Sequence, residues 1–382
     1  MQRDKLLMTP GPTNIPYKVR EAMSRPMIHH RTEEFGFYFN QMNKGLKMVF
    51  QTENPVLTLA SSGTGAMEAS ITNVFSPGDK VLIANGGVFG DRLVKIADRF
   101  GLDVVTMDIP WGQEVTGDDI EAILSSEKGE GIKGVLITHN ETSTGVTNDI
   151  ESIGNLLKDR DCLLIVDAIS SLGGIDLQTD NWGVDIVIAG SQKAFMLPPG
   201  LAFVSVSQRA WAAVEKSTFP KFYFDFSAYR ESLEKNTTPY TPAATLIIGA
   251  SESLKMIKEQ GLEDIFARHE NLAKACRAAV KALGLELFAS ENAASNLITS
   301  IKSPDKIDIE RVRAILNLDY DIMVAGGQQH LKGRILRIGH MGYVDGFDLI
   351  KTLSALERAL IEAGYDIELG TAVSAAQTVL KY

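Results

Sequence analysis

Three short stretches of this 382-residue sequence carry side chains that could do chemistry together. The first is SSGTGAMEA, residues 61–69, which follows an apolar run and opens a helical pattern. Gly63 and Gly65 let backbone N–H groups approach a ligand closely, and the hydroxyls of Ser62 and Thr64 add donors, so the turn could hold a phosphate. An ordinary tight turn is the alternative. The stretch lacks the G-x-G-x-x-G spacing and the lysine of a P-loop, which disfavours dinucleotides and nucleoside triphosphates.

A carboxylate and a lysine follow two further apolar runs. Asp167 ends LLIVD, where capping the next segment would be its ordinary role. Lys193 stands four residues after DIVIA and shortly before a Pro-Pro-Gly turn, where a lysine is usually solvated. Because the carboxyl ends of parallel strands meet at one edge of a sheet, we expect both side chains near the SSGTGAMEA turn.

These three features match the needs of pyridoxal 5′-phosphate. Its phosphate requires an anion site, its aldehyde requires a lysine that forms a Schiff base, and its ring nitrogen requires a carboxylate that keeps it protonated. The sequence therefore predicts a pyridoxal phosphate site with Lys193 and Asp167 as its catalytic residues.

The elements that would position these residues belong to an α/β domain. Apolar runs alternate with helical patterns between residues 55 and 206. The runs contain Val, Ile and Leu almost without alternation, which is typical of a mainly parallel sheet buried on both faces. Seven strands are predicted: Val56–Ala60, Lys80–Ala84, Asp103–Asp108, Lys133–His139, Cys162–Val166, Asp185–Ala189 and Leu201–Ser207.

A smaller α+β unit is predicted to follow. Its elements are helices over residues 263–283, 308–318 and 345–363 and strands over residues 296–301, 321–325 and 334–338. The expected organisation is an N-terminal arm (1–17), a large cofactor-binding domain (18–255) and a small C-terminal domain (256–382). Prolines 10, 12 and 16 predict an extended arm, which could reach a second subunit.

Composition excludes several classes of function. Lys and Arg total 38 against 48 for Asp and Glu, and a net charge of −10 disfavours nucleic acid and anionic membranes as partners. The sequence has no run of about 18 apolar residues and no signal peptide, and its two cysteines fit buried thiols, so we expect a cytoplasmic protein. His29 and His30 lack the spacing of metal ligands, and no metal is predicted.

The motifs together resemble a known family. The resemblance covers nearly the whole chain and rests on TPGPTNIP (9–16), SSGTGAMEA (61–69), NGGVFGDR (85–92), THNETSTGV (138–146), VDAISSLGG (166–174), GSQKAFMLPPGL (190–201), TPYTPA (238–243) and LRIGHMG (336–342). GSQK followed by PPG is the most specific, and the spacing of 26 residues from Asp167 to Lys193 is also similar to the family's. The chain resembles the class V branch of fold-type I pyridoxal phosphate enzymes, in the alanine–glyoxylate and serine–pyruvate (serine–glyoxylate) aminotransferase group.

The resemblance implies a role for each matched residue. Lys193 would carry the cofactor and move the proton, and Asp167 would pair with the ring nitrogen. The remaining cofactor contacts that it implies are Ser62, Gly63, Thr64 and Gln192 at the phosphate, and Phe89 and Thr142 at the ring. Phe89 falls where many relatives have a tryptophan stacked on the ring, so the aromatic plate is smaller in this chain.

Two further implications concern the partner subunit and the substrate. Thr238, Tyr240 and Thr241 resemble the segment by which a neighbouring subunit closes the phosphate site, which implies a homodimer with shared active sites. Arg337 resembles the arginine that binds the substrate carboxylate, for which a planar guanidinium is well suited. Arg334 is the nearby alternative, and the odd spacing on a strand points the two arginines to opposite faces.

The predicted function is that of an aminotransferase. The enzyme would move an amino group from a small amino acid, alanine or serine, to a small 2-oxo acid, glyoxylate or pyruvate. The short apolar and hydroxyl-bearing residues around the site do not suggest a second cationic pocket for a dicarboxylate. The alternatives are another amino donor, such as aminoethylphosphonate or ureidoglycine, and a non-catalytic subunit that keeps the fold for interaction.

Overall fold

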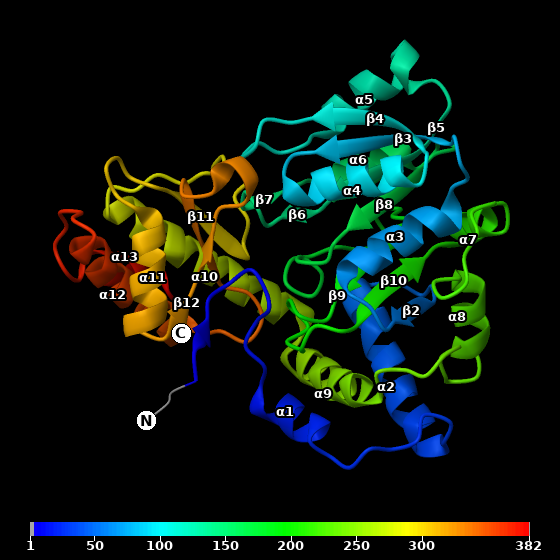
Figure 1. Ribbon diagram of the computed structural model, residues 1–382, viewed down its shortest axis with the longest axis horizontal. Helices are drawn as coiled ribbons and strands as arrows, with labels where there is room; N and C mark the ends of the chain where they lie inside the picture. Colours follow the sequence, from blue (N-terminus) through cyan, green and yellow to red (C-terminus); the bar gives the residue numbers. More distant parts are fainter. Residues whose placement is uncertain (1–3, 382) are drawn as a thin grey trace.

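A computed structural model describes residues 4–381, which form two lobes joined by helix α10 (Leu262–Ala282) (Figure 1). The larger lobe contains a seven-stranded sheet in the order β2-β10-β9-β8-β5-β3-β4. β10 pairs antiparallel with both its neighbours and the other neighbouring strands pair parallel, as predicted for a mainly parallel sheet. The strands are β2 (Val56–Leu59), β3 (Lys80–Asn85), β4 (Asp103–Asp108), β5 (Ile132–Thr138), β8 (Leu163–Asp167), β9 (Ile186–Gly190) and β10 (Ala202–Val206). All seven predicted strands are confirmed, to within one or two residues at each end.

Helices cover both faces of this sheet, which explains the unbroken apolar runs. Successive side chains of a strand point to opposite faces. On β9, Val187 and Ala189 join one hydrophobic cluster, and Ile186 and Ile188 join another. The helices of this lobe are α1 (Tyr17–Met23), α2 (Glu33–Phe50), α3 (Gly63–Val74), α4 (Val88–Arg99), α5 (Gly117–Leu124), α6 (Ile150–Leu157), α7 (Gln208–Val214), α8 (Phe226–Leu233) and α9 (Ala244–Gln260), with a 3₁₀ turn at Glu127–Gly129.

The smaller lobe has its own core beneath a three-stranded antiparallel sheet of order β11-β14-β13. Its elements are α10 (Leu262–Ala282), β11 (Ile298–Lys302), α11 (Ile309–Asp319), β12 (Ile322–Met323), β13 (Ala325–Gly326), β14 (Ile335–Gly339), α12 (Gly346–Glu362) and α13 (Thr371–Val379), with a 3₁₀ turn at Gln329–Leu331. The domain boundary proposed at residue 255 falls inside α9, which packs against α2 of the large lobe.

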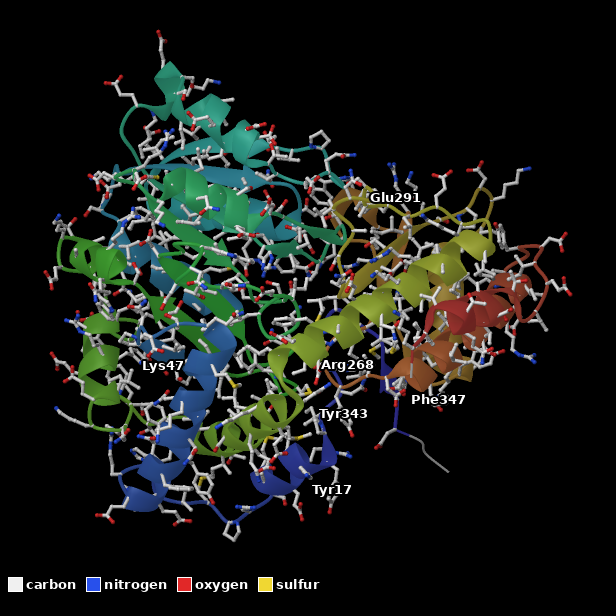
Figure 2. All side chains as sticks on the ribbon, turned by 180° about the vertical axis from the view of Figure 1, so that it is seen from behind. Tyr17, Lys47, Arg268, Glu291, Tyr343 and Phe347 are labelled. Atoms are coloured by element: carbon white, nitrogen blue, oxygen red, sulfur yellow. The ribbon has the colours of Figure 1, made fainter. Side chains whose placement is uncertain are left out.

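The chain crosses between the lobes at Gly261, where α9 ends and α10 begins. Gly261 has a φ of +86°, which favours glycine. Arg268 of α10 donates to the carbonyl oxygens of Gly342 and Val344 at 3.0 and 2.8 Å, on either side of Tyr343. Figure 2 shows Arg268 and Tyr343 close together below α10. These bonds hold α10 against the segment that leads from β14 to α12.

The N-terminal segment runs between the two lobes (Figure 1). Leu6 and Leu7 form β1, which pairs parallel with β12 of the same chain. Met8 lies in the core of the small lobe, and the N–H of Thr13 donates to the carbonyl oxygen of Gln192 in the large lobe. The segment expected to reach a second subunit therefore contacts its own chain from residue 6 to residue 13.

Two other local predictions were incomplete. The strand expected over 321–325 is divided, because Ile322–Met323 pairs with β1 and Ala325–Gly326 pairs with β14. The antiparallel pair β6 (Asn140–Glu141) and β7 (Val146–Thr147) and the helix α13 were not predicted. Both cysteines are buried and free, as expected. None of the helices within residues 4–381 is long and apolar enough to span a membrane.

Candidate active site

The predicted phosphate cup is the start of α3. The N–H groups of Gly65 and Ala66 donate to the carbonyl oxygen of Ser62, whereas those of Gly63 and Thr64 have no preceding helical turn to donate to. Ser62, the N-cap, makes no side-chain cap bond. A Cβ on Gly63 would lie 2.5 Å from Ile169, so only glycine lets the helix start pack this closely on the loop after β8. Arg92 donates to the hydroxyl of Thr64 at 3.1 Å.

Asp167 ends β8 at the carboxyl edge of the sheet, as predicted. Its side chain is 3% exposed and accepts from the N–H of Ile169 at 2.9 Å. Burial raises the pKa of Asp167 to about 6, while this hydrogen bond and the positive charges of Lys193 and Arg92 act in the opposite direction. Ile169 contacts the start of α3, so the carboxylate and the phosphate cup belong to one neighbourhood.

Lys193 lies in the turn after β9 and is also buried. Its ammonium nitrogen donates to the carbonyl oxygen of Pro10. Burial lowers the pKa of Lys193 to about 8, the negative charge of Asp167 opposes this shift, and Arg337 and Arg92 add to it. A lysine with a pKa near neutrality has a useful fraction of the neutral amine, which is the form that attacks an aldehyde.

Gln192 carries a buried polar atom that lacks a partner. Its Oε1 has no hydrogen bond to any residue in 4–381. A Cβ on Gly190 would lie 3.0 Å from this oxygen and 3.1 Å from Ile169, the residue that also packs on Gly63. Gln192 therefore lies beside the phosphate cup, where its Nε2 could donate to a phosphate.

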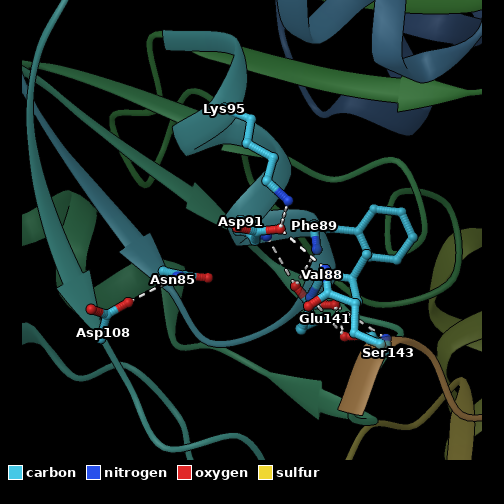
Figure 3. Close-up of polar contacts among 10 residues, drawn as sticks. Asn85, Val88, Phe89, Asp91, Lys95, Asp108, Glu141 and Ser143 are labelled. Atoms are coloured by element: carbon cyan, nitrogen blue, oxygen red, sulfur yellow. Dashed lines mark hydrogen bonds and ion pairs between the residues drawn. The ribbon is translucent and has the colours of Figure 1, made fainter. Parts of the chain in front are cut away.

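Glu141, a residue that was not singled out from the sequence, binds the backbone of Phe89 to its own loop (Figure 3). The buried Glu141 carboxylate accepts from the N–H groups of Phe89 and Gly90 at 3.0 and 3.1 Å and from the N–H and hydroxyl of Ser143. A negative charge at the start of α4 is favourable there, although burial raises the pKa of Glu141. The result is a fixed position for the Phe89 ring beside the Thr142 loop.

Arg92 was also missed, although it lies in the NGGVFGDR motif. Its guanidinium is 4.8 Å from the centre of the Phe89 ring, and it reaches Thr64 as described above. A spacing of three residues on a helix places Phe89 and Arg92 on one face, and this spacing could have identified Arg92 from the sequence.

The structure separates the two candidate arginines for the substrate carboxylate. Arg337 lies on β14 and is 5% exposed, whereas Arg334 precedes the strand and is exposed. Arg337 donates from Nε and Nη2 to the carbonyl oxygen of Gly326 at 2.9 and 2.7 Å, and from Nη1 to that of Thr142 at 2.7 Å. A guanidinium has five N–H donors, so two remain for a ligand. Burial lowers the pKa of Arg337 to about 10, with Glu141 acting against the shift.

A cleft of about 330 Å³ connects several of these groups. Four of the predicted site residues line it: Phe89, Thr142, Lys193 and Arg337. Thr238, Tyr240 and Thr241 do not; they surround a separate small pocket, where Tyr240 donates to the carbonyl oxygen of Phe222 at 2.9 Å. Within one chain, Thr238, Tyr240 and Thr241 therefore do not line this cleft.

The residues present fit pyridoxal phosphate. The start of α3 and the Nε2 donor of Gln192 suit a phosphate, and the buried Asp167 carboxylate suits a protonated ring nitrogen. The buried Lys193 amine suits an aldehyde. The assignment of each residue to each cofactor atom remains a prediction.

The chain is similar to known proteins over nearly its whole length. The chain is 46% identical to a protein of Synechococcus named soluble hydrogenase, small subunit, across 100% of this chain and 99% of that protein. It is 40% identical to the L-aspartate–glyoxylate aminotransferase of Paracoccus denitrificans, across 97% and 95% of the two chains. It is 35% identical to the serine–glyoxylate aminotransferase of Methylorubrum extorquens, across 98% and 96%.

Solved structures show the same fold. The crystal structure of ureidoglycine–glyoxylate aminotransferase from Bacillus subtilis superimposes with a TM-score of 0.95 at 32% identity, over 99% of this chain and 98% of that one. The sequence profile described as Aminotransferase class-V matches residues 8–341. With its fold, its buried lysine and carboxylate and this match, the chain belongs to the class-V aminotransferase family.

Proposed function

We propose that this aminotransferase uses pyridoxal 5′-phosphate to move an amino group from a small amino acid, alanine or serine, to a small 2-oxo acid, glyoxylate or pyruvate. The proposal depends on one observation: Lys193 and Arg337 line the same cleft. An α-amino acid held by its carboxylate at Arg337 has its α-carbon within that cleft, where Lys193 can act on it.

Each residue has a defined task in this proposal. The bound cofactor supplies an electron-withdrawing ring that acidifies the substrate's α-carbon. Lys193 removes the proton from the substrate's α-carbon and returns a proton to the carbon on the other side of the transferred nitrogen. Asp167 holds a proton at the ring nitrogen, and its burial strengthens that charge interaction. Arg337 binds the carboxylate that the amino acid and the oxo acid share.

The functional unit that we propose is a homodimer in which Thr238, Tyr240 and Thr241 complete the phosphate site of the neighbouring subunit. These residues do not line the cleft of their own chain, which supports this role. Exposed aromatic side chains nearby also support an interface, since Phe222 is 79% exposed and its ring centre lies 5.6 Å from that of Tyr240. The two buried free thiols agree with the reducing cytoplasm as the proposed compartment.

A screen of amino donors tests the proposed reaction. The holoenzyme is mixed with alanine, serine, aminoethylphosphonate or ureidoglycine without an acceptor, and the loss of its near-visible absorbance is followed. Rapid loss with alanine or serine, recovered by glyoxylate or pyruvate, is the expected result. Loss only with one of the other donors would replace the proposed substrate, and no change with any amino acid would favour the non-catalytic alternative.

A further inference from the structure

The cleft that contains Lys193 and Arg337 is cationic, although the whole chain has a net charge of −10. Three charged side chains line it, Lys193, Arg313 and Arg337, and no carboxylate is among its lining residues in the described part of the chain. The proposed reaction uses Lys193 for proton transfer and Arg337 for the α-carboxylate. Arg313 has no task in that scheme.

Arg313 lies on α11 of the small lobe, at the mouth of the cleft, with its side chain 44% exposed. Its Nε and Nη2 contact the Glu310 carboxylate at 2.8 and 2.6 Å. Arg313 lines the cleft and Glu310 does not, and a partly exposed ion pair of this kind is weak enough for a ligand to displace. This arrangement keeps the guanidinium in place while part of it stays open to a ligand.

Gly326 lies near both arginines. Its carbonyl oxygen accepts from Arg337 at 2.7 and 2.9 Å, and a Cβ on Gly326 would lie 2.6 Å from Oε1 of Glu310 and 3.4 Å from Nε of Arg313. Standard backbone dimensions then place the two guanidinium groups at most about 9 Å apart. A short dicarboxylate spans a gap of this size when one carboxylate binds Arg337 and the other replaces the Glu310 carboxylate at Arg313.

We propose that Arg313 is a specificity-determining residue that binds the second carboxylate of a short dicarboxylic amino acid, such as aspartate, while Arg337 binds the first. The enzyme then accepts such a donor in addition to alanine and serine. This inference rests on the proposed function, because it requires the substrate α-carboxylate to bind at Arg337. This role could not be predicted for Arg313 from the sequence, since an arginine at an exposed helical position is usually solvated.

Kinetics with matched donors test the inference. Aspartate and asparagine have nearly the same shape and differ in the charge that Arg313 would bind. In the wild type, kcat/KM for aspartate should exceed that for asparagine by about tenfold or more. Arg313→Gln should remove most of that preference and leave kcat/KM for alanine nearly unchanged. Arg311→Gln, an exposed arginine on the same helix that does not line the cleft, should keep the preference.

Binding of unreactive acids supplies a readout that needs no turnover. Calorimetry on the wild-type holoenzyme should show succinate binding about tenfold more tightly than propionate, and Arg313→Gln should bind the two acids alike. Equal affinity for the two acids in the wild type, or an unchanged aspartate preference in Arg313→Gln, would overturn the assignment. Alanine and serine turnover separates the two proposals: its absence contradicts the proposed function, whereas its presence without an aspartate preference contradicts only the role of Arg313.

Discussion

The ammonium group of Lys193 donates a hydrogen bond to the main-chain carbonyl oxygen of Pro10, a residue 183 positions earlier in the chain. The hydroxyl of Thr13 donates to the carbonyl oxygen of Lys193 at 2.9 Å, so the N-terminal segment contacts both ends of this residue. The segment also pairs with the small lobe through β1. The position of the lysine therefore depends on a part of the chain that bridges the two lobes.

Gly11→Ala should impair catalysis through this contact. A Cβ at this position would lie 2.6 Å from Cδ of Lys193 and 2.9 Å from its Nζ, so the lysine must move. We expect kcat/KM to fall at least about tenfold, because small displacements of a reacting group are costly. Gly101→Ala is the control. Gly11 and Gly101 both have a positive φ, +124° and +74°, but Gly101 has open space around it, so the Gly101→Ala enzyme should lose some stability and keep full activity. Equal activity in the two variants would contradict the positioning role of the segment.

Asp167→Asn should stabilise the cofactor-free protein and reduce its activity. The folded pKa of Asp167 is about 6, above its usual 3.8, so between these values the folded state binds a proton that the unfolded state has released. The stability from that proton is present below about pH 4 and is lost as the pH rises through 6. At pH 7 the variant should be more stable by about 1–3 kcal/mol in urea unfolding. Its kcat should fall more than its KM changes, because the charge on the ring nitrogen matters most in the transition state.

The opposite pH trend would contradict this account of Asp167. A wild type that gains stability relative to Asp167→Asn between pH 4 and 7 would show that the folded pKa is lowered. A variant in which only KM rises would show that Asp167 has no part in the chemical step.

Arg337 variants should lose the distinction between an amino acid and an amine. Arg337→Lys keeps the charge and loses the fork geometry, and Arg337→Ala also leaves the carbonyl oxygens of Gly326 and Thr142 without their donor. The preference for alanine over ethylamine should shrink in the order wild type, Lys, Ala, by roughly a hundredfold or more for Ala. A full preference retained in Arg337→Ala would transfer this role to another residue.

Mixed dimers should test the sharing of active sites. Lys193→Ala should be inactive, and a triple variant with Ala at Thr238, Tyr240 and Thr241 should be weak, because each of its sites lacks the partner's native segment. When the two are mixed and allowed to exchange subunits, each heterodimer has one intact site, formed by the triple variant's lysine and the segment of the Lys193→Ala subunit. Activity should therefore rise on mixing. If activity stays at the level of the separate variants, while sedimentation shows that heterodimers have formed, the segment does not serve the neighbouring site.

The large sheet was predictable because its strands are short apolar runs that helices bury on both faces, as β9 shows with Ile186 and Val187 in different clusters. The ends of two such runs also located Asp167 and Lys193. Local sequence has no comparable signal for contacts between distant segments. The Pro10 carbonyl is a backbone group, and its contact with Lys193 depends on how residues 6–13 lie between the lobes.

The side chains that the sequence analysis missed, Glu141 and Arg313, also depend on contacts between distant segments. Glu141 stands in a quoted motif, but its task is to bind the first turn of α4, which lies 51 residues away in sequence. Arg313 reaches the cleft because α11 packs beside β13, a neighbour relation set by the tertiary fold. Both residues carry a charge whose place in the site is decided by packing and not by the pattern around them.

The central claim is that Lys193 is the residue that reacts with the cofactor aldehyde. Borohydride reduction of the holoenzyme, followed by peptide mass mapping, measures this directly, because reduction fixes the cofactor to the amine that holds it. The account predicts one pyridoxyl group on Lys193, and none in Lys193→Ala, which should bind the cofactor without fixing it. A pyridoxyl group on another lysine, or labelling and full activity that survive in Lys193→Ala, would contradict it.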